Sequence, residues 1–347
     1  MRLHQLIHTN RRVMDPCVEQ TPLFTFGVIA DVQYADIDDG YNYTRTRRRF
    51  YRSSLRLLAN ALRSWSEPAG PAFILQLGDL IDGFNKPRDA SEVALRAVLE
   101  QFGGGAPRVH HVWGNHEFYN FSRAELLRSR LSGRAGPGPP ARPDLHAYHF
   151  SPRPGFRFVV LDAYDVSVLG REESSEEHSS ALSLLRLHNH NTDLNCPPAS
   201  GGLKERFTKF NGGFGKDQLA WLDSVLSSAD ESQEKVTLVS HLPAHPGSTE
   251  PVCLAWNYDE LLALIRSHGS VVCYMAGHAH DGGYCRDEDT GVHHLTLDGV
   301  IETPPDSDAF ATVSVYTDRM LLKGSGRVTD RVFKFPCFQY NGPSPTG

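Results

Sequence analysis

The sequence has few cysteines, no long apolar run and no excess of positive charge. Its six cysteines are scattered over 347 residues without a C-x-x-C pair, so neither a thiolate metal site nor a disulfide scaffold is indicated, and a reducing compartment is favoured. No stretch approaches the length that spans a bilayer, and residues 1–20 lack the apolar segment of a signal peptide. We therefore expect a cytoplasmic protein without a membrane partner.

The chain has fewer basic than acidic residues. Lysine and arginine total 35 against 41 aspartate and glutamate residues, which gives a net charge of -6. This charge provides no global attraction for nucleic acid, so a polyanionic polymer is not the expected substrate. No internal repeat or sharp change in composition marks a domain boundary. We expect residues 1–347 to form a single domain, with a core at about 24–323, that acts as a monomer on a small molecule.

Strand and helix patterns alternate along most of the chain. Six short apolar or β-branched runs are each followed by a glycine or a polar turn: 24–30, 73–77, 109–113, 156–161, 236–240 and 271–275. Apolar residues at helical spacing lie between several of these runs, at 51–62, 219–226 and 261–265. This alternation predicts an α/β sheet protein.

The last part of the chain breaks the alternation. Runs at 292–297, 310–316 and 320–323 follow one another without a helical pattern, which predicts antiparallel strands and therefore a mixed sheet. Three segments rich in polar residues, glycine or proline are typical of loops: 133–143, 171–180 and 187–202. We expect loop insertions near 133–143 and 171–202 that interrupt the domain without dividing it.

Five of the predicted strands end at residues with metal-binding side chains. The first three lead into Asp31-Val32-Gln33, Gly78-Asp79-Leu80-Ile81-Asp82 and Gly114-Asn115-His116-Glu117. The last two lead into His241-Leu242-Pro243 and Gly277-His278-Ala279-His280. Because an open α/β sheet binds its ligands beyond the carboxyl ends of its strands, we expect these clusters to converge on one crevice.

The residue types of these clusters suit a metal site. Carboxylate, imidazole and amide groups bind manganese, zinc or iron(II), whereas the scattered cysteines argue against thiolate ligands. Glycines at positions 78, 114 and 277 permit tight turns through which a short side chain can reach an ion. His278 and His280 are two residues apart, so in an extended segment they point to the same side. Two ions could each take one of these histidines.

The order of the five motifs resembles that of the calcineurin-like metallophosphoesterase superfamily, whose pattern is D-x-H, G-D-x-x-D, G-N-H-[ED], a histidine before x-P, and G-H-x-H. The resemblance covers about residues 24–323. It implies an α/β (α+β) fold, a four-layer αββα sandwich with two central mixed sheets. It also implies two metal ions, one held by Asp31, Gln33, Asp79 and His280, and the other by Asp79, Asn115, His241 and His278.

Gln33 departs from the superfamily pattern, because most members have histidine there. A glutamine carbonyl is a harder and weaker ligand than imidazole, which favours Mn²⁺, with Mg²⁺, Fe²⁺ and Zn²⁺ as alternatives. With Asn115 and the glycine-rich segment 211–215, Gln33 makes the chain resemble one manganese-dependent branch of the superfamily. That resemblance implies hydrolysis of the phosphoanhydride bond of ADP-ribose, CDP-choline or CDP-glycerol. The products would be a nucleoside monophosphate and a phospho-alcohol or sugar phosphate.

The superfamily resemblance also implies a catalytic role for His116. Two divalent ions about 3.5 to 4 Å apart would activate a bridging water, so that a metal-bridging hydroxide attacks phosphorus in line. In the superfamily the histidine of G-N-H protonates the leaving oxygen. An imidazole, with an ordinary pKa of about 6.5, is suited to that step at cellular pH.

The sequence leaves the substrate contacts open. A nucleotide base needs a flat apolar wall with a few polar groups. Candidates lie in the segments 118–120, 210–214 and 253–256, among them Phe118, Tyr119, Asn120, Phe214 and Cys253. Core or lid packing is the alternative for each.

Charged residues near the motifs also have two interpretations. Asp82 is expected either to orient a histidine or to cap a helix, and Glu117 either to support the ligands or to lie in solvent. Basic residues cluster after the first motif: Arg45, Arg47, Arg48, Arg49 and Arg52. They could steer an anionic substrate, but the pattern favours a solvated helix face.

Other functions compete with this hypothesis. The segment 78–83 is not followed by the arginine of phosphoprotein phosphatases, and Asp82 stands where purple acid phosphatases have tyrosine, so both classes are disfavoured. Cyclic-nucleotide phosphodiesterase activity stays open, because such a site attacks phosphodiesters as well as anhydrides. Outside enzymes, the alternative is a catalytically silent scaffold protein. Every predicted ligand position retains a donor atom, which argues against it.

Overall fold

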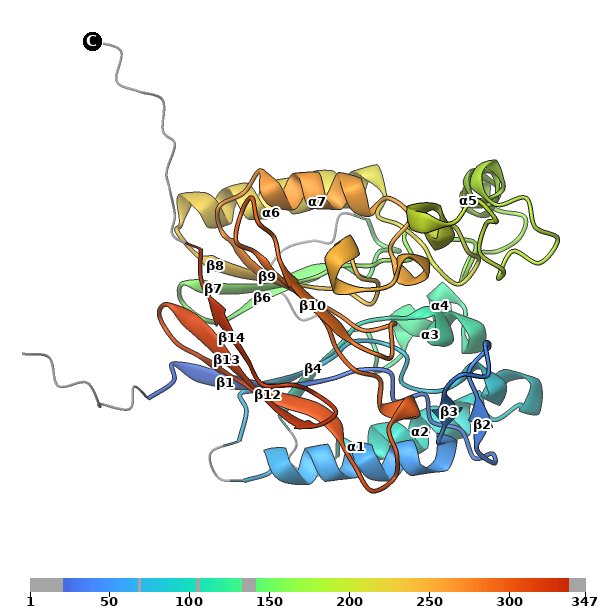
Figure 1. The fold of residues 1–347 in the computed structure, drawn as a ribbon, viewed down its shortest axis with the longest axis horizontal. Coiled ribbons are helices and arrows are strands. Elements are labelled where there is room, and N and C mark those ends of the chain that lie inside the picture. The colour runs from blue at the N-terminus through green and yellow to red at the C-terminus, as the bar shows by residue number, and fades with distance from the viewer. Residues whose placement is uncertain (1–20, 68–69, 104–106, 133–141, 337–347) are drawn as a thin grey trace, which may run out of the picture.

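Two mixed β-sheets, packed face to face, form the centre of the molecule. The computed structural model describes residues 21–67, 70–103, 107–132 and 142–336. Each large sheet has six strands, and helices cover the outer face of both (Figure 1). The four-layer αββα sandwich implied by the resemblance is therefore confirmed.

The first sheet carries five of the predicted strands side by side, in the order β14-β13-β12-β1-β4-β5. The bounds are β1 Phe24–Ile29, β4 Phe73–Gln76, β5 Arg108–His111, β12 Ala309–Val315, β13 Arg319–Gly326 and β14 Arg331–Lys334. β1, β4 and β5 run parallel, whereas β12, β13 and β14 join antiparallel. Helices α1 (Tyr51–Trp65) and α2 (Ser91–Gln101) lie along its outer face (Figure 1).

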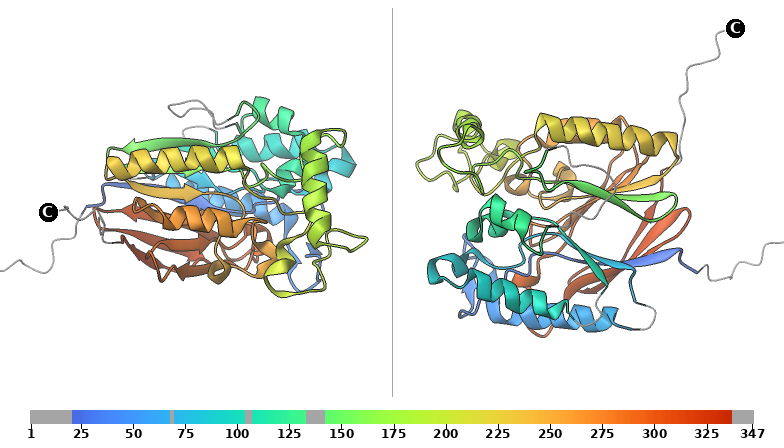
Figure 2. Two further views of the ribbon diagram at one scale, coloured as in Figure 1. Left: turned by 90° about the horizontal axis from the view of Figure 1, so that it is seen from above. Right: turned by 180° about the vertical axis from the view of Figure 1, so that it is seen from behind.

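The second sheet has the order β10-β11-β9-β8-β7-β6. The bounds are β6 Tyr148–Arg153, β7 Phe156–Val160, β8 Lys235–Val239, β9 Val271–Ala276, β10 Gly283–Arg286 and β11 His293–Thr296. β7, β8, β9 and β11 run parallel. Helices α6 (Lys216–Glu231) and α7 (Tyr258–Arg266) cover this sheet on the side away from the first (Figure 2).

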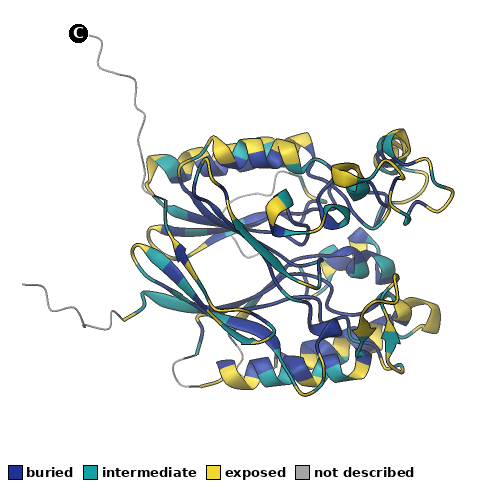
Figure 3. Cartoon of the chain, in the orientation of Figure 1, coloured by how far each residue is buried: buried dark blue, intermediate teal, exposed yellow. Residues whose placement is uncertain are grey.

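Aromatic side chains fill the space between the sheets. Phe26 of β1 stacks on Phe73 of β4 with ring centroids 5.2 Å apart, and Phe158 of β7 meets the same two rings edge-on at 5.2 and 5.0 Å. The strands that are largely buried are β1, β4, β7, β8, β9, β11 and β12 (Figure 3). Burying a large apolar side chain stabilises a fold by roughly 1.5–3 kcal/mol. This core therefore holds the two sheets, and the loops at their strand ends, in one arrangement.

One strand prediction is wrong in its pairing. Residues 292–297 contain β11, which lies in the second sheet and pairs in parallel with β9. Antiparallel pairing holds for its other neighbour, β10, and for β12 with β13 in the first sheet. Pairing partners depend on the path of the intervening turn, which a run of apolar residues does not encode.

The predicted insertion at 171–202 is not only loop. It contains helix α5 (Glu176–His188), so the loop predicted at 171–180 is wrong from residue 176 onward. The side chain of Ser175 accepts a hydrogen bond from the His178 N–H, and acidic residues in the first turn favour the helix start. Most of the predicted loop at 133–143 lies outside the described residues.

Short elements complete the edge where the predicted motifs lie. They are β2 Gly40–Tyr41, β3 Arg48–Arg49, α3 Asn115–Asn120, α4 Arg123–Arg128, η1 Gly83–Arg88, η2 Gly202–Arg206, η3 Pro246–Ser248, η4 Pro251–Cys253 and η5 Val300–Glu302. Among the helices of the described ranges, none has both the length and the apolar character needed to cross a membrane.

Candidate dinuclear metal centre

The five motifs meet at the carboxyl ends of the strands that precede them. Hydrogen bonds between backbone groups join their loops: the Asp31 N–H donates to Gly78 O at 3.2 Å, and the Gly277 N–H donates to His241 O at 3.0 Å. The predicted ligands at positions 31, 33, 79, 115 and 241 are all buried. The structure therefore brings together residues that lie up to about 250 positions apart, from Asp31 to His280.

Backbone strain is concentrated in these loops. Asp31, Gln33, Asp79 and His278 have φ values of 53°, 44°, 56° and 70°, in the left-handed region that residues other than glycine rarely adopt. Such conformations cost of order 1–3 kcal/mol each and persist only where the surroundings enforce them. At Gly114 a Cβ atom would lie 2.2 Å from Asp79 Oδ1, so glycine is required there.

Hydrogen bonds fix the tautomers of two buried histidines. His241 Nδ1 lies 2.7 Å from the carbonyl oxygen of Leu77, so this nitrogen carries the hydrogen and Nε2 presents a lone pair. His278 Nε2 lies 2.9 Å from Asn211 Oδ1, whose amide nitrogen donates to two backbone carbonyls. His278 Nε2 therefore donates to Asn211, and its Nδ1 presents the lone pair.

When both rings are neutral, four donor atoms without hydrogens face one another. His241 Nε2 lies 3.1 Å from His278 Nδ1, 3.3 Å from Asn115 Oδ1 and 3.4 Å from Asp79 Oδ2. Lone pairs at these distances repel unless a cation lies between them. Imidazole nitrogen, carboxylate oxygen and amide oxygen together suit a divalent ion of the first transition row. The donor set of Asp79, Asn115, His241 and His278 fits a metal ion.

A second group of donors lies on the other side of Asp79. His280 Nδ1 donates to Glu302 Oε1 at 2.8 Å, so its Nε2 presents a lone pair. This Nε2 lies 3.4 Å from Asp31 Oδ1 and 2.9 Å from Gln33 Nε2. A second cation could therefore bind here to two carboxylates and one imidazole, which come from Asp31, the shared Asp79 and His280.

Gln33 occupies the predicted position with a specific amide orientation. Its Nε2 points to His280 and donates to Asp79 Oδ2 at 3.2 Å, while its Oε1 accepts a hydrogen bond from Arg49 Nη1 at 3.3 Å. Coordination through oxygen, as the resemblance implies, requires a half turn about the Cγ–Cδ bond. Such a turn exchanges two groups of nearly equal size.

Protons and cations compete for these histidines. Burial opposes a charge on His241, but Asp79 raises the pKa of His241 to about 9. Burial also opposes a charge on His280, but Asp31 and Glu302 raise the pKa of His280 to about 9. A cation must displace these protons, so its affinity rises with pH up to about 9.

His116 lies beside the metal donors with a defined tautomer. Its Nδ1 accepts the N–H of Gly83 at 2.8 Å, so the hydrogen of the neutral ring is on Nε2. That nitrogen is 3.9 Å from Asp79 Oδ2 and faces the site. Asp82 Oδ1 caps η1, and its Oδ2 lies 3.4 Å from His116 Nδ1, so both interpretations offered for Asp82 apply in part.

Glu117 is a buried support and not a solvated side chain. Its carboxylate accepts three backbone N–H groups, from Asp79 and Gly114 through Oε2 and from Leu80 through Oε1, at 2.7 to 2.8 Å. Burial and the nearby Asp79 raise the pKa of Glu117 to about 7, against the effect of those three donors. Glu117 thereby joins the loop after β4 to the start of α3.

A pocket of about 670 Å³ opens over the two donor groups. Of the predicted substrate contacts, Tyr119 and Cys253 line it. The other three do not: Phe118 and Phe214 lie in the hydrophobic core, and Asn120 is buried with its amide on the carbonyls of Asp82 and His116. These three residues are packed in the interior, as the core-packing alternative predicted.

Several residues of the pocket had no signal in the motif pattern. Tyr41, Tyr43 and Phe84 supply aromatic faces, and Phe210, from the candidate segment 210–214, supplies another. Arg49 lies inside the pocket, so the solvated-face interpretation is wrong for this member of the basic cluster, whereas Arg52 is exposed and pairs with Asp36 and Asp38. The pairing of β2 with β3 could have indicated that Arg49 points inward, but two-residue strands leave no periodicity.

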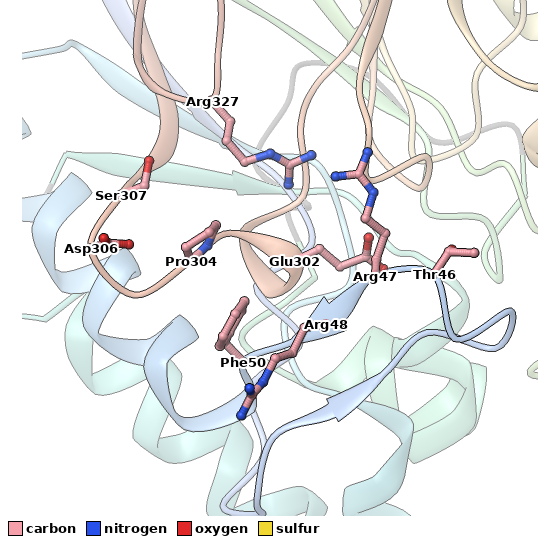
Figure 4. A pocket seen from close by; sticks show the side chains of 9 residues that line it. All are labelled: Thr46, Arg47, Arg48, Phe50, Glu302, Pro304, Asp306, Ser307 and Arg327. Carbon is pink, nitrogen blue, oxygen red and sulfur yellow. The ribbon is translucent and has the colours of Figure 1, made fainter.

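A smaller hollow of about 480 Å³ adjoins this pocket. Figure 4 shows the guanidinium groups of Arg47 and Arg327 pointing toward each other across its rim, near Glu302. Both groups pair with Asp281, at 2.5 and 3.3 Å. Because these cations already have a carboxylate partner, the hollow offers little uncompensated positive charge.

The chain is similar in sequence to a known protein family and to several characterised relatives. Residues 24–282, which include all five motifs, match the family model described as Calcineurin-like phosphoesterase. The manganese-dependent ADP-ribose/CDP-alcohol diphosphatase of Danio rerio is 56% identical over 317 residues, 90% of this chain and 98% of that protein. The protein of the same name from Homo sapiens is 52% identical over 322 residues, 90% of this chain and 93% of that protein.

A solved structure agrees with the fold. A dimetal phosphatase from Danio rerio superimposes with a TM-score of 0.87 at 56% sequence identity. The match covers 90% of this chain and 99% of that chain.

The role of Glu117 can be tested by Glu117→Gln. A glutamine has one carbonyl oxygen and two N–H donors, so at least one buried backbone N–H loses its acceptor. We expect the free energy of unfolding to fall by about 2–3 kcal/mol in chemical denaturation. The exposed Glu92→Gln in α2 is the matched control, with a change of about 0.5 kcal/mol or less. Equal stability of the two variants would contradict the role assigned to Glu117.

Proposed function

Because this chain belongs to the calcineurin-like phosphoesterase family, we propose that it hydrolyses the phosphoanhydride bond of nucleoside diphosphate-linked compounds such as ADP-ribose and CDP-alcohols. The products are a nucleoside monophosphate and a sugar phosphate or phospho-alcohol. The observation that carries the proposal is the convergence of lone pairs on both sides of Asp79. The names of relatives that align over 90% of the chain support this substrate class.

We propose that the metal ligands are the residues that the family resemblance implies. One ion is held by Asp31, Gln33, Asp79 and His280, and the other by Asp79, Asn115, His241 and His278. Oxygen and imidazole donors without thiolate suit Mn²⁺. Cys253 lines the pocket, but burial raises the pKa of its thiol well above the ordinary value, so it is not a thiolate ligand.

When bound, two divalent ions supply Lewis acidity and a reactive water at neutral pH. The chain supplies the geometry for the remaining steps. As an imidazolium, with Nδ1–H turned to Asp82 Oδ2 in place of the Gly83 N–H, His116 can donate its Nε2 proton, which faces the site, to the leaving phosphate oxygen. Asp82 Oδ2, 3.4 Å from Nδ1, stabilises this imidazolium, and the neutral ring left after the transfer keeps its hydrogen on Nδ1.

The pocket suits a substrate with a flat base and charged phosphates. A volume of about 670 Å³ falls in the range of small-molecule sites. Tyr43 and Phe84 line it and are 76% and 50% exposed, so their rings are available to stack on a base. The metal ions would be the main partners of the phosphates, because Arg49 in the pocket wall is already paired with Asp82 and Glu302.

We further propose that the chain acts in the cytoplasm as a monomer. Cys196, Cys253, Cys273 and Cys285 are unpaired, as expected in a reducing compartment. The exposed large apolar side chains of the described residues include Tyr41, Tyr43 and Phe84, which line the pocket. The others are scattered over several elements and form no obvious interface.

The substrate proposal can be tested by direct assay. ADP-ribose, CDP-choline, a 2′,3′-cyclic nucleotide and a phosphomonoester should be offered with Mn²⁺, Mg²⁺ and Zn²⁺ in turn. We expect ADP-ribose and CDP-choline to be cleaved fastest with Mn²⁺, with AMP or CMP detected by chromatography. Activity on the phosphomonoester alone, or no activity with any metal, would contradict the proposal. Activity on the cyclic nucleotide alone would favour the phosphodiesterase alternative.

The role of His116 predicts a separation of metal binding from turnover. His116→Ala should retain two Mn²⁺ per chain, because Nδ1 is occupied by Gly83 and Nε2 is not among the converging donors. We expect kcat to fall by about 10²–10⁴. His190→Ala, at an exposed position outside the pocket lining, serves as the control. Metal-free His116→Ala protein, or a variant with full kcat, would refute the assignment.

The identity of residue 33 should affect which metal ion the site prefers. Gln33→His replaces a weak neutral ligand by imidazole, so the affinity for Zn²⁺ should rise relative to that for Mn²⁺. Calorimetric titration of both metals into wild-type and variant protein measures the ratio. We expect the variant to favour Zn²⁺ by roughly a factor of ten more than the wild type does. An unchanged ratio would mean that residue 33 does not set the preference.

A further inference from the structure

Glu302, which none of the five motifs includes, lies directly behind one of the proposed metal ligands. We infer that Glu302 is a positioning residue for the ion held by Asp31, Gln33, Asp79 and His280, and that its charge compensates for the weak neutral ligand Gln33. This inference rests on the metal assignment of the proposed function. It concerns how tightly one ion of the pair is held.

The backbone around Glu302 is tied to the loops of the site. In η5 the N–H of Val300 donates to Ala30 O at 3.1 Å, and the N–H of Ile301 donates to Asp31 O at 2.9 Å. Glu302 therefore extends from a segment bonded directly to the first motif. The carboxylate is almost entirely buried, with 4% of the side chain exposed. A carboxylate in such a place needs partners for its charge.

His280 is the first of those partners. Its Nδ1 donates to Glu302 Oε1 at 2.8 Å, which leaves Nε2 free to face Asp31 and Gln33. On the ring's other side, a Cβ atom at Gly299 would lie 2.9 Å from the imidazole, so the ring is closely confined. A carboxylate behind a ligand histidine fixes its orientation and raises its basicity. Glu302 thus strengthens His280 as a ligand.

Arg49 is the second partner and connects Glu302 to Gln33. Arg49 Nε lies 3.4 Å from Glu302 Oε1, and Arg49 Nη1 donates to Gln33 Oε1 at 3.3 Å. The same Nη1 lies 3.9 Å from Asp82 Oδ2. Figure 4 shows the side chain of Glu302 reaching from η5 toward Arg47. Arg49 therefore balances the charge of Glu302, while the Glu302 carboxylate keeps its hydrogen bond from His280.

In the described part of the chain, the histidines proposed for the other ion have no such carboxylate behind them. His241 donates to the backbone carbonyl of Leu77 at 2.7 Å, and His278 donates to the amide of Asn211 at 2.9 Å. Both acceptors are neutral, so they orient the rings but add less to ligand basicity than a carboxylate does. The ion with the weak ligand Gln33 is the one whose histidine has an anionic partner. Loss of the Glu302 charge should therefore lower the affinity for that ion and leave the affinity for the other ion unchanged.

The experiment is a titration of metal-free protein with Mn²⁺. Glu302→Gln retains the size and an acceptor oxygen but removes the charge. Calorimetry should show two Mn²⁺ sites in the wild type, and in the variant one affinity reduced by ~10–100-fold with the other unchanged. Electron paramagnetic resonance should show loss of the spin-coupled Mn²⁺ pair at Mn²⁺ concentrations that saturate the wild type. Glu92→Gln removes one exposed charge from α2, outside the pocket lining, and should leave both affinities unchanged.

Rescue separates a ligand effect from a structural one. Gln33→His in the Glu302→Gln background should restore the weakened affinity, because imidazole replaces the weak ligand. If Glu302→Gln does not fold, as judged by circular dichroism, Glu302→Asp withdraws the carboxylate from His280 and carries the same test. Equal loss at both sites, no loss at either, or failure of the rescue would overturn the inference. A wild type that binds fewer than two Mn²⁺ would instead refute the proposed function.

Discussion

The buried carboxylate of Asp79 is the group around which the site is arranged. It lies between the two donor groups, with 1% of the residue exposed, and an isolated charge in that position would be strongly destabilising. Its Oδ1 accepts the backbone N–H of His116 at 2.8 Å, and its Oδ2 faces His241 and Gln33. The strained backbone of the neighbouring loops, and glycine at position 114, follow from the need to bring these partners close to one carboxylate.

Charge balance explains why this arrangement suits divalent cations. Five buried carboxylates lie in or beside the site: Asp31, Asp79, Asp82, Glu117 and Glu302. Arg49 compensates for part of that charge at Asp82 and Glu302. The histidines cannot supply the remainder without protons on the nitrogens that face one another. Two bound divalent ions would neutralise the excess and relieve the repulsion between lone pairs.

The sequence predicted the parts of the site that depend on local pattern. Strand ends are recognisable because an apolar run stops at a glycine or polar residue, so all the proposed ligands were located from the sequence. The direction of side chains on short elements was not predictable. Phe118 and Tyr119 are neighbours on α3, and successive residues of a helix point about 100° apart, so one packs in the core and the other lines the pocket. Glu302 was missed, and Arg49 was expected on a solvated face, because tertiary contacts alone bring Glu302 to His280 and Arg49 to Glu302.

Crystals grown with Mn²⁺ test the central claim most directly, through anomalous diffraction at the manganese absorption edge. We expect two peaks about 3.5–4 Å apart, both in contact with Asp79. One should be bounded by Asp31, Gln33 and His280, and the other by Asn115, His241 and His278. The Gln33 amide should also have turned its oxygen toward the first peak. A single peak, no peak, or peaks away from Asp79 would contradict this account.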